Sequence, residues 1–535
     1  MKTLVNFIKN KKLHIGLFII SALVWACTFI TDSKMFTSDT LNMMCFPINS
    51  DAVPFMHITS KALAFLIIFG MLEFLVYGWK HKKLLVSFLC FFTLYIIILL
   101  CNYPGYYMSD DTIIFGYATR YYPVYWHNYL TSLYYMTGMT LFPASTGPII
   151  LNDLSLALVF SYIFYKADML FQTKGKYALI ICGLVPFVLL SALMSFRPAL
   201  YAPVFLFFFA YLYFEKKEQK PLTITKLMGL ALLVAILCFW RSEGIVLVVF
   251  CLLLIPLCYG LNYQKMGLFL LAFAIFFTTV KLPQNVGEKK YYGSDYLIIS
   301  TVRPLSLIIH REQTYDGAEE DLANIDSIID LDYMSYETLS CSSYNRYNSD
   351  FNAGRFSETG ADAETQKAYL KSALRLILHN MDLYFAERLQ LFLVTNQIYN
   401  YDKDLVMGME PVTTMDFHLY QSDKVYGYEL VDGNKRLPLS SDNQLALALF
   451  NMGGEAYLPI LGLLFISLIY SAIKKKGFIF CTLLSLLARE AVIFLTAPAS
   501  FIQYSYPVMF VTAFLALILI VEYFETNIEA KKMQN

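Results

Sequence analysis

Residues 84–111 read LLVSFLCFFTLYIIILLCNYPGYYMSDD, and this stretch decides the fold class. Its first part, residues 84–101, contains no charged side chain. A helix needs about 20 mostly apolar residues to cross the hydrocarbon of a bilayer. The run therefore predicts a transmembrane helix. A Pro-Gly turn follows it and ends the helix, and two adjacent carboxylates, Asp110 and Asp111, come shortly after that turn.

The whole chain of 535 residues shares this character, because 57% of it is apolar and 15% is charged. Soluble domains contain about 45–50% apolar and about 25% charged residues. The 41 basic and 41 acidic residues balance, which excludes a basic nucleic-acid-binding protein. The ten cysteines lack the spacing of a disulfide framework or of a zinc site. The composition predicts a membrane protein.

Comparable apolar runs recur at about twelve places, so we predict an all-α polytopic membrane protein with about twelve transmembrane helices. The first run lacks a small-residue cleavage site and is expected to be retained as a span. The runs lie at Leu13–Ile30, Ala62–Trp79, Leu84–Cys101, Pro148–Tyr165, Tyr177–Met194, Pro198–Phe214, Lys226–Trp240, Gly244–Gly260, Met266–Val280, Tyr457–Ser471, Gly477–Thr496 and Phe501–Tyr523.

The distribution of lysine predicts the orientation, because short loops rich in Lys and Arg face the cytoplasm. With the N-terminus inside, the basic clusters of both tails and of four short loops all fall on the cytoplasmic side. The loop clusters are Lys80–Lys83, Lys174–Lys176, Lys216–Lys220 and Lys474–Lys476. We therefore expect a multi-pass protein of the cell membrane with both termini in the cytoplasm.

Two long segments then lie outside the membrane. The first, residues 102–147, is expected to be helical, whereas the second carries 25 acidic and 15 basic residues and is expected to be a larger mixed domain. The predicted organisation is a tail with two additional helices (1–83), a transmembrane core (84–280), an extracytoplasmic domain (281–444) and C-terminal helices (445–535).

The second outer segment contains at least one predicted helix. Between Glu364 and Ile398, apolar residues recur at helical spacing, at Leu370, Leu374, Ile377, Leu378, Met381, Phe385 and Leu389. This stripe could pack on the outer domain or rest on the membrane surface.

The acidic pair is the most informative feature of the first outer loop. Adjacent carboxylates resist simultaneous ionisation, so one could hold a proton, or the pair could bind a divalent cation such as Mg²⁺ or Mn²⁺. Either state suits Asp110 or Asp111 as a general base or metal ligand. The alternative is a helix start, in which Ser109 or Asp110 caps a helix at Thr112.

Aromatic residues surround this pair, including Tyr107 and Trp126, and His127 and Asn128 follow directly. Aromatic rings at a membrane interface can stack on sugars, although aromatic belts also occur there without any ligand. His127 and Asn128 add hydrogen-bonding groups beside this surface, although a single histidine is more often structural.

A polytopic membrane protein whose first large outer loop carries a DxD, DDx, DEx or ExD motif resembles the GT-C superfamily of glycosyltransferases. That group includes protein O-mannosyltransferases, aminoarabinose transferases and the catalytic subunit of oligosaccharyltransferase, and Asp110-Asp111 matches its DDx variant. The Tyr-Pro-Gly lead-in and the later histidine resemble bacterial members of the group, in which proline often follows that histidine; here Asn128 follows His127. The loop follows the third span rather than the first.

The resemblance implies an inverting transfer of a sugar from a polyprenyl phosphate to a glycan, lipid or protein of the cell envelope. Cationic side chains would hold the leaving phosphate, since the guanidinium fork binds two of its oxygens. The candidates are Arg197, Arg241, Arg303, His310 and Arg311, with Glu243 beside Arg241. For each single arginine the alternative is an interfacial side chain that reaches the lipid headgroups.

Arg489 and Glu490 lie within a predicted span, where charges usually face a bundle interior or an aqueous cavity. We expect Arg489 to point into the substrate cavity, with a structural tie to another helix as the alternative. Tyr504 lies in a turn that resembles the arginine-tyrosine turn near the end of several such transferases; Gln503 replaces its arginine.

Two other functions remain open from the sequence. An O-antigen-type polymerase or ligase has a similar layout but relies on arginine and histidine rather than on an acidic pair. A transporter or flippase would show an internal repeat, which we do not find. Glycine-rich nucleotide-binding motifs are absent as well.

Overall fold

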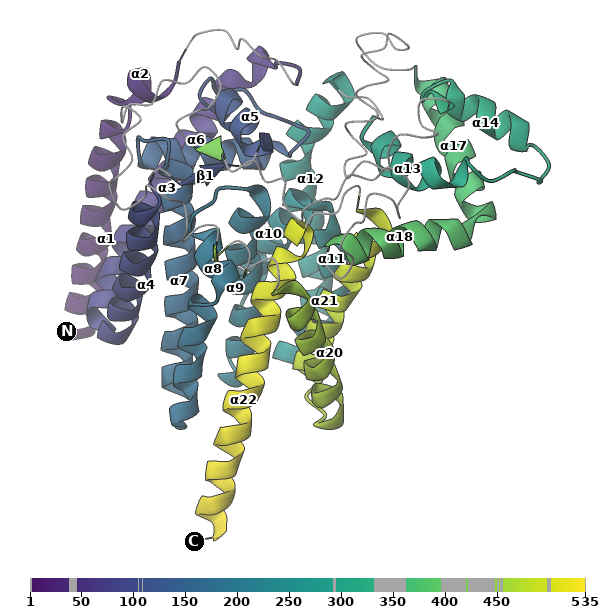
Figure 1. The fold of residues 1–535 in the computed structure, drawn as a ribbon. Coiled ribbons are helices and arrows are strands. Elements are labelled where there is room, and N and C mark those ends of the chain that lie inside the picture. Colours follow the sequence, from purple (N-terminus) through teal and green to yellow (C-terminus); the bar gives the residue numbers. More distant parts are fainter. Residues whose placement is uncertain are drawn as a thin grey trace.

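The computed structural model describes residues 2–37, 46–103, 105–107, 109–291, 295–331, 362–395, 456–497 and 502–534, with short pieces between 420 and 452. These residues form a helical bundle with an outer helical cluster at one end (Figure 1). Regular strand pairing in the described part is limited to β1 (Tyr106–Tyr107) and β2 (Tyr420–Gln421), which are antiparallel.

Eight helical segments of the described chain are long and apolar enough to cross a membrane. They contain α3 (Val53–Lys80), α4 (Lys82–Cys101), α7 (Gly147–Leu170), α9 (Arg197–Lys217), α11 (Val246–Tyr259) with the short η3 (Ser242–Ile245), α12 (Tyr263–Tyr291), α21 (Gly477–Thr496) and α22 (Tyr506–Gln534). Three further apolar helices are shorter: the end of α1 (Lys2–Cys27), α10 (Ile224–Trp240) and α20 (Tyr457–Ile473). The predicted helical, polytopic class is confirmed, whereas a count of twelve spans is not.

The predicted span Tyr177–Met194 is not one continuous α-helix. It forms the 3-10 helix η2 (Lys174–Gly183) and the short α8 (Pro186–Ser191). Pro186 forces Val185 into an extended conformation between them. A Cβ atom on Gly183 would lie 2.5 Å from the Phe91 ring, so the chain passes closely against α4 there.

The core of the bundle lies around α7, α9 and α22, most of whose apolar windows are buried. By contrast, α3 and α12 bury only about a tenth of their apolar windows inside the protein, as expected for lipid-facing helices. Helices α1 and α3 lie side by side at the edge of the bundle (Figure 1). That these two helices are an addition to the core stays a prediction.

The predicted basic clusters gather at one end of the bundle, which we call the lysine end. Asp168 pairs with Lys83 at 2.5 Å and with Lys176 at 2.7 Å. Glu522 on α22 pairs with Lys217 at 2.8 Å and with Lys476. Four loops thus meet at the same end, as the alternation of spans predicted. The opposite end is called the far end below.

The first predicted outer loop is helical, as expected. It contains α5 (Ser109–Ala118) and α6 (Tyr129–Leu141) before α7 begins. Gly138 and Gly147 let α6 and α7 approach closely, because a Cβ on Gly138 would lie 2.7 Å from Pro148 Cα. The loop therefore packs onto the bundle at the far end (Figure 1).

The second predicted outer segment begins later than expected, because α12 continues to Tyr291, beyond the predicted boundary at 280. Its described part contains α13 (Asp295–Ile308), α14 (Ala318–Asp326), α17 (Ala363–His379) and α18 (Met381–Thr395). Helices α13, α14 and α17 share a separate small core that includes Ile298, Leu305, Ile325, Tyr369 and Leu376.

The stripe predicted as one helix from Glu364 to Ile398 forms two helices with a corner at Asn380. The Asn380 side chain donates to the Leu376 carbonyl and to Gln313 Oε1, at 2.9 and 2.7 Å. These bonds hold the corner against the chain after α13. Helix α18 then lies across the bundle axis (Figure 1). Two small helical elements, α2 (Asp32–Met35) and η1 (Ser50–Ala52), complete the N-terminal part, and η7 (Ile502–Ser505) precedes α22.

Candidate functional site

Asp110 and Asp111 lie in the first turn of α5, where the helix dipole favours acidic residues. A helix does start at the pair, but it begins at Ser109 rather than at Thr112. The capping role of Ser109 or Asp110 stays a prediction. Asp111 is buried, with 3% of its surface exposed, whereas the side chains of Asp110 and Tyr107 lie outside the described residues. The predicted roles of the pair as base or cation ligand stay predictions.

The aromatic residues after the pair mostly pack inside the protein. Phe115 is fully buried and meets Tyr135 edge to face, with ring centroids 6.2 Å apart. The Tyr117 hydroxyl donates to the Phe46 carbonyl and accepts the Phe46 amide. Trp126 stacks on Phe46 and also touches the small core of the second outer segment. These rings join the two outer segments to the bundle.

His127 and Asn128 hold the turn before α6. Asn128 has a φ of +70°, and its side-chain oxygen accepts the Leu130 amide at 3.0 Å as the helix N-cap. Its amide nitrogen donates to the Phe239 carbonyl on α10 at 2.8 Å. The His127 carbonyl accepts a bond from Arg197 at 3.1 Å. Asn128 thus ties the first outer loop to α10, which gives this residue a structural role.

Two predicted phosphate-binding arginines in this region form ion pairs with carboxylates. Arg241 is buried and forms two hydrogen bonds with Glu243, at 3.2 and 2.6 Å, and its guanidinium lies 5.5 Å from the centre of the Tyr504 ring. Arg303 is also buried and pairs with Glu387. A phosphate bound at either arginine would have to share the guanidinium with that carboxylate.

Two further predicted cations, Arg311 and His310, are more exposed. Arg311 forms two hydrogen bonds with Asp382, at 2.9 and 2.7 Å, near the corner between α17 and α18. His310 is exposed at the end of α13. Hydrogen bonding to Asp382 raises the pKa of Arg311, and the same bond lowers the pKa of Asp382. The pair therefore stays ionised at the protein surface.

Arg489 and Glu490 are both buried within α21. Arg489 Nη1 donates to the Tyr504 carbonyl at 2.9 Å and lies 3.7 Å from Glu490 Oε1, while its Nε and Nη2 have no hydrogen-bond partner in the described structure. Glu490 Oε2 accepts bonds from the hydroxyls of Tyr457 and Ser505, at 2.5 and 2.6 Å. At 3.7 Å these neighbours pair less closely with each other than with the groups on other elements.

These two residues join Arg241 and Glu243 in one buried group of four charges. Glu243 interacts electrostatically with both Arg241 and Arg489. Two arginines and two glutamates balance each other, which lowers the cost of burying them. The group links the end of α10 to α21 and to the turn that contains Tyr504.

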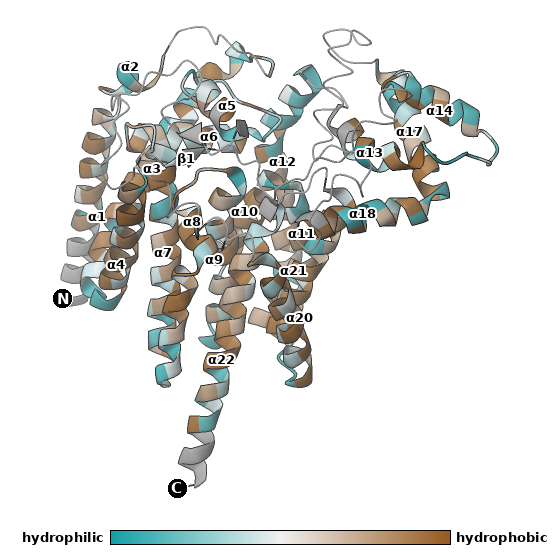
Figure 2. Ribbon diagram, viewed as in Figure 1, coloured by the Kyte–Doolittle hydropathy of each residue, from teal (hydrophilic) through white to brown (hydrophobic). Residues whose placement is uncertain are grey.

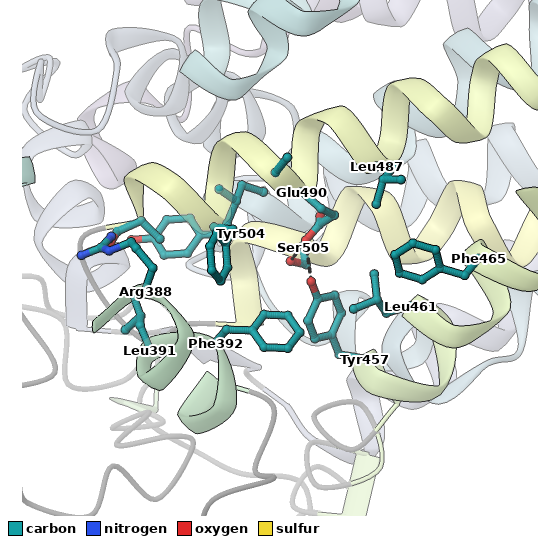
Figure 3. A pocket seen from close by; sticks show the side chains of 14 residues that line it. Arg388, Leu391, Phe392, Tyr457, Leu461, Phe465, Leu487, Glu490, Tyr504 and Ser505 are labelled. Atoms are coloured by element: carbon teal, nitrogen blue, oxygen red, sulfur yellow. Dashed lines mark hydrogen bonds between the residues drawn. The ribbon is translucent and has the colours of Figure 1, made fainter. Parts of the chain in front are cut away.

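A cavity of about 320 Å³ lies beside this group, between α18, α20, α21 and the turn before α22 (Figure 3). Most of its wall is apolar, and it includes Phe392, Leu461, Phe465 and Leu487. Its polar groups come from Arg388, Tyr457, Glu490, Tyr504 and Ser505. Neither Asp111 nor Arg489 lines this cavity, whereas Tyr504 does. The substrate roles of Tyr504 and Arg489 stay predictions.

Arg388 is the functional candidate that the sequence reasoning missed. It is buried, pairs with Glu387, and donates to the Ala497 carbonyl at 2.6 Å. Because Glu387 pairs with both Arg303 and Arg388, the group of three carries one net positive charge. The signal was present, since Glu387 and Arg388 are adjacent charges inside an apolar helical stripe.

The described residues contain no group of three His, Cys, Asp or Glu side chains arranged to hold a metal ion. The Asp110 side chain lies outside this description, so the divalent cation at the acidic pair stays a prediction.

The described parts of the chain define a helical protein with eight candidate membrane spans and an amphipathic cavity at the far end. No family model, no curated protein and no solved structure matches the chain. The function is therefore inferred from the geometry and chemistry of the site itself.

Proposed function

We propose that this protein is an inverting glycosyltransferase of the cell membrane that uses a polyprenyl-phosphate sugar. The cavity between α18, α20 and α21 is the observation that carries this proposal. Apolar walls suit the tail of a lipid carrier, and Arg388 offers a net positive charge for its phosphate. The acceptor would be a glycan, lipid or protein of the cell envelope.

The proposed orientation puts the lysine end in the cytoplasm and the far end outside, because basic loops stay on the cytoplasmic side. The acidic second segment, with a net charge of −10, then faces the exterior. A donor lipid could reach the cavity from the bilayer, because the cavity lies beside α20 and α21.

In the proposed reaction, a carboxylate of Asp110 or Asp111 removes the proton from an acceptor hydroxyl. The acceptor oxygen attacks the anomeric carbon while the bond from that carbon to the phosphate oxygen breaks. The polyprenyl phosphate leaves with the bonding electrons, and a cationic side chain stabilises its charge. General-base catalysis typically contributes about 10²–10⁴-fold, and electrostatic stabilisation of the leaving group adds a further large factor.

One observation favours the polymerase or ligase as a second candidate. The charged residues that line the cavity are Arg388 and Glu490, and Asp111 is not among them. A site built around arginine, away from the acidic pair, is typical of that class rather than of a DDx-dependent transferase.

The two candidates are separated by incubating membranes with radiolabelled polyprenyl-phosphate sugars. Asp110→Asn, Asp111→Asn and Arg388→Gln are compared with the parent at equal protein abundance. Asp382→Asn is the matched control, because this acid is exposed and pairs with Arg311 on the surface. The first proposal expects a loss of about 10²-fold or more in at least one of the two aspartate variants, with the control unchanged.

Loss of transfer in Arg388→Gln alone would favour the polymerase or ligase. If all three variants label the acceptor as fast as the parent, the transferase proposal fails. Arg388→Lys tests the charge separately, since it keeps the cation but loses the planar fork that holds Glu387.

A further inference from the structure

An exposed apolar surface covers the corner between α17 and α18. Its members recur at helical spacing, and each side chain is at least one third exposed. They are Leu374 (58%), Leu378 (59%), Met381 (37%), Phe385 (46%) and Leu389 (52%), and we call them the corner face. Five large apolar side chains on one surface exceed the scattered exposure that is normal for a protein in water.

The corner face points away from the protein. The buried side of α18 contains Glu387 and Leu391, which lie opposite Phe385, and Arg388, which lies at its edge, about 60° around the helix from Phe385. That buried side meets α13 through the Arg303–Glu387 ion pair and meets α21 through the Arg388 bond to Ala497. The helix is thus held from one side, with its apolar side left outward.

The level of α18 along the bundle matches the end of a candidate membrane span. Its Tyr384 hydroxyl donates to the Leu495 carbonyl at 2.6 Å, in the last turn of α21. Leu495 is itself 40% exposed, so apolar surface is present on both neighbouring helices. Helix α18 also lies across the bundle axis, and its surface is partly hydrophobic (Figures 1 and 2). This is the orientation of an amphipathic helix in the plane of a membrane interface.

Two lysines follow the same side of α17 away from the corner. Lys367 and Lys371 are exposed, and the spacing 367, 371, 374, 378 keeps them in line with the two leucines. Lys367 lies about 16 Å along the helix from Leu378, at about 1.5 Å per residue. Apolar residues thus lie at the corner, and lysines lie farther along α17 toward its N-terminus. This order matches the change from acyl chains to anionic headgroups across a membrane interface.

From these observations we propose that the corner face rests in the headgroup and acyl boundary of the bilayer. The occupant is the lipid surface itself, in continuity with the apolar surface of α21. This contact would hold α18 in place, and with it Leu391 and Phe392, which form part of the cavity wall. The inference does not depend on the transferase proposal, because it concerns lipid contact rather than chemistry.

Tryptophan substitution in the full chain tests this proposal. Leu378→Trp, Phe385→Trp and Leu389→Trp are each reconstituted in phosphatidylcholine vesicles whose acyl chains carry bromine, either near the headgroup or near the chain end. The fluorescence of the four native tryptophans is measured in the parent chain and subtracted. The remaining fluorescence of the introduced tryptophan is expected to be quenched at least twofold more strongly by bromine near the headgroup than by bromine near the chain end. Lys371→Trp and then Lys367→Trp, which lies farther from the corner, should show progressively weaker quenching.

Glu320→Trp is the matched control, because this residue is exposed on α14 and not on the corner face. It should be quenched by aqueous iodide and not by brominated lipid. Iodide quenching at positions 385 and 389 would mean that the corner face is in water, and it would overturn the proposal. Absence of quenching by both agents would also overturn it, because protein would then cover the face.

Discussion

At the scale of single residues, the site is organised by buried carboxylates that each have identified donors. Glu490 accepts two hydroxyls, Glu387 holds two arginines, and Glu243 holds Arg241. A buried charge without such partners would destabilise the fold by several kcal/mol. The carboxylates therefore position the arginines beside the cavity as much as they neutralise them.

Tyr457→Phe tests the bond to Glu490. The variant leaves the buried carboxylate with one hydroxyl donor, so we expect the free energy of unfolding to fall by about 1–3 kcal/mol. The measurement is denaturant unfolding of the purified protein in detergent. Tyr263→Phe serves as control, because the Tyr263 side chain is 80% exposed and its hydroxyl is free to bond with solvent. Equal stability of the two variants would show that the Tyr457 hydroxyl contributes nothing.

At the scale of elements, helix ends and helix crossings determine where the outer segments lie. Helix α17 begins at the N-cap Asp362, whose carboxylate accepts the amides of Glu364 and Thr365, each at 2.9 Å. Helices α6 and α7 meet at Gly138 and Gly147. The cap fixes where α17 begins. The close crossing of α6 and α7 fixes the loop that contains the acidic pair.

The Asp362 cap makes the start of α17 sensitive to acid. Hydrogen bonds from the amide and hydroxyl of Thr365 lower the pKa of Asp362 below its ordinary value. The stabilisation is therefore complete above the ordinary pKa of about 3.9 and is lost as the pH falls through the lower value in the folded state. We expect protection of the Glu364 and Thr365 amides against hydrogen exchange to fall as the pH is lowered below the ordinary pKa of about 3.9.

Asp362→Asn is the control for this effect, because asparagine caps a helix well but does not titrate in this range. Its protection factors should stay level over the same pH interval. A parallel fall in both proteins would assign the acid sensitivity to another group.

The crossing of α6 and α7 should not accept a larger residue. In Gly138→Ala the new Cβ would lie 2.7 Å from Pro148 Cα and 2.8 Å from Pro148 N, so a backbone shift is required. We expect a loss of about 1–3 kcal/mol in the free energy of unfolding. Gly229→Ala on α10 should cause no loss, since no atom lies within 4 Å of its Cβ. Thermal unfolding of both variants checks this contrast, and equal stability would contradict it.

At the scale of the whole molecule, the sequence predicted what depends on local composition. Hydropathy located α4 and α21 to within two residues and α7 and α9 to within five, because an apolar run of membrane length has few other structures available. It failed at Tyr177–Met194, where the conformation around Pro186 and the packing of Gly183 against Phe91 break the run. Such packing joins residues far apart in sequence and leaves no local signal.

The candidate site was predictable to a similar extent. The sequence pointed to Arg241, Glu243 and Tyr504, which the structure brings together at the far end. It could not predict the partners of these side chains, since the Arg303–Glu387 pair joins helices 84 residues apart. Asn128 shows the same limit, because its structural bond to Phe239 depends on a positive φ and a distant helix.

The orientation of the molecule gives the last prediction. The lysine end gathers four basic loops, and the segment 281–444 carries a net charge of −10, so an N-terminus inside satisfies the positive-inside rule throughout. Cysteine is introduced at two exposed positions, Glu320→Cys on α14 and Lys174→Cys at the lysine end, and sealed right-side-out membranes are treated with a membrane-impermeant maleimide. After subtraction of the labelling of the parent chain, Glu320→Cys should react at once and Lys174→Cys only after permeabilisation. The reverse pattern would put the cavity on the cytoplasmic side, where the proposed transfer to an envelope acceptor could not take place.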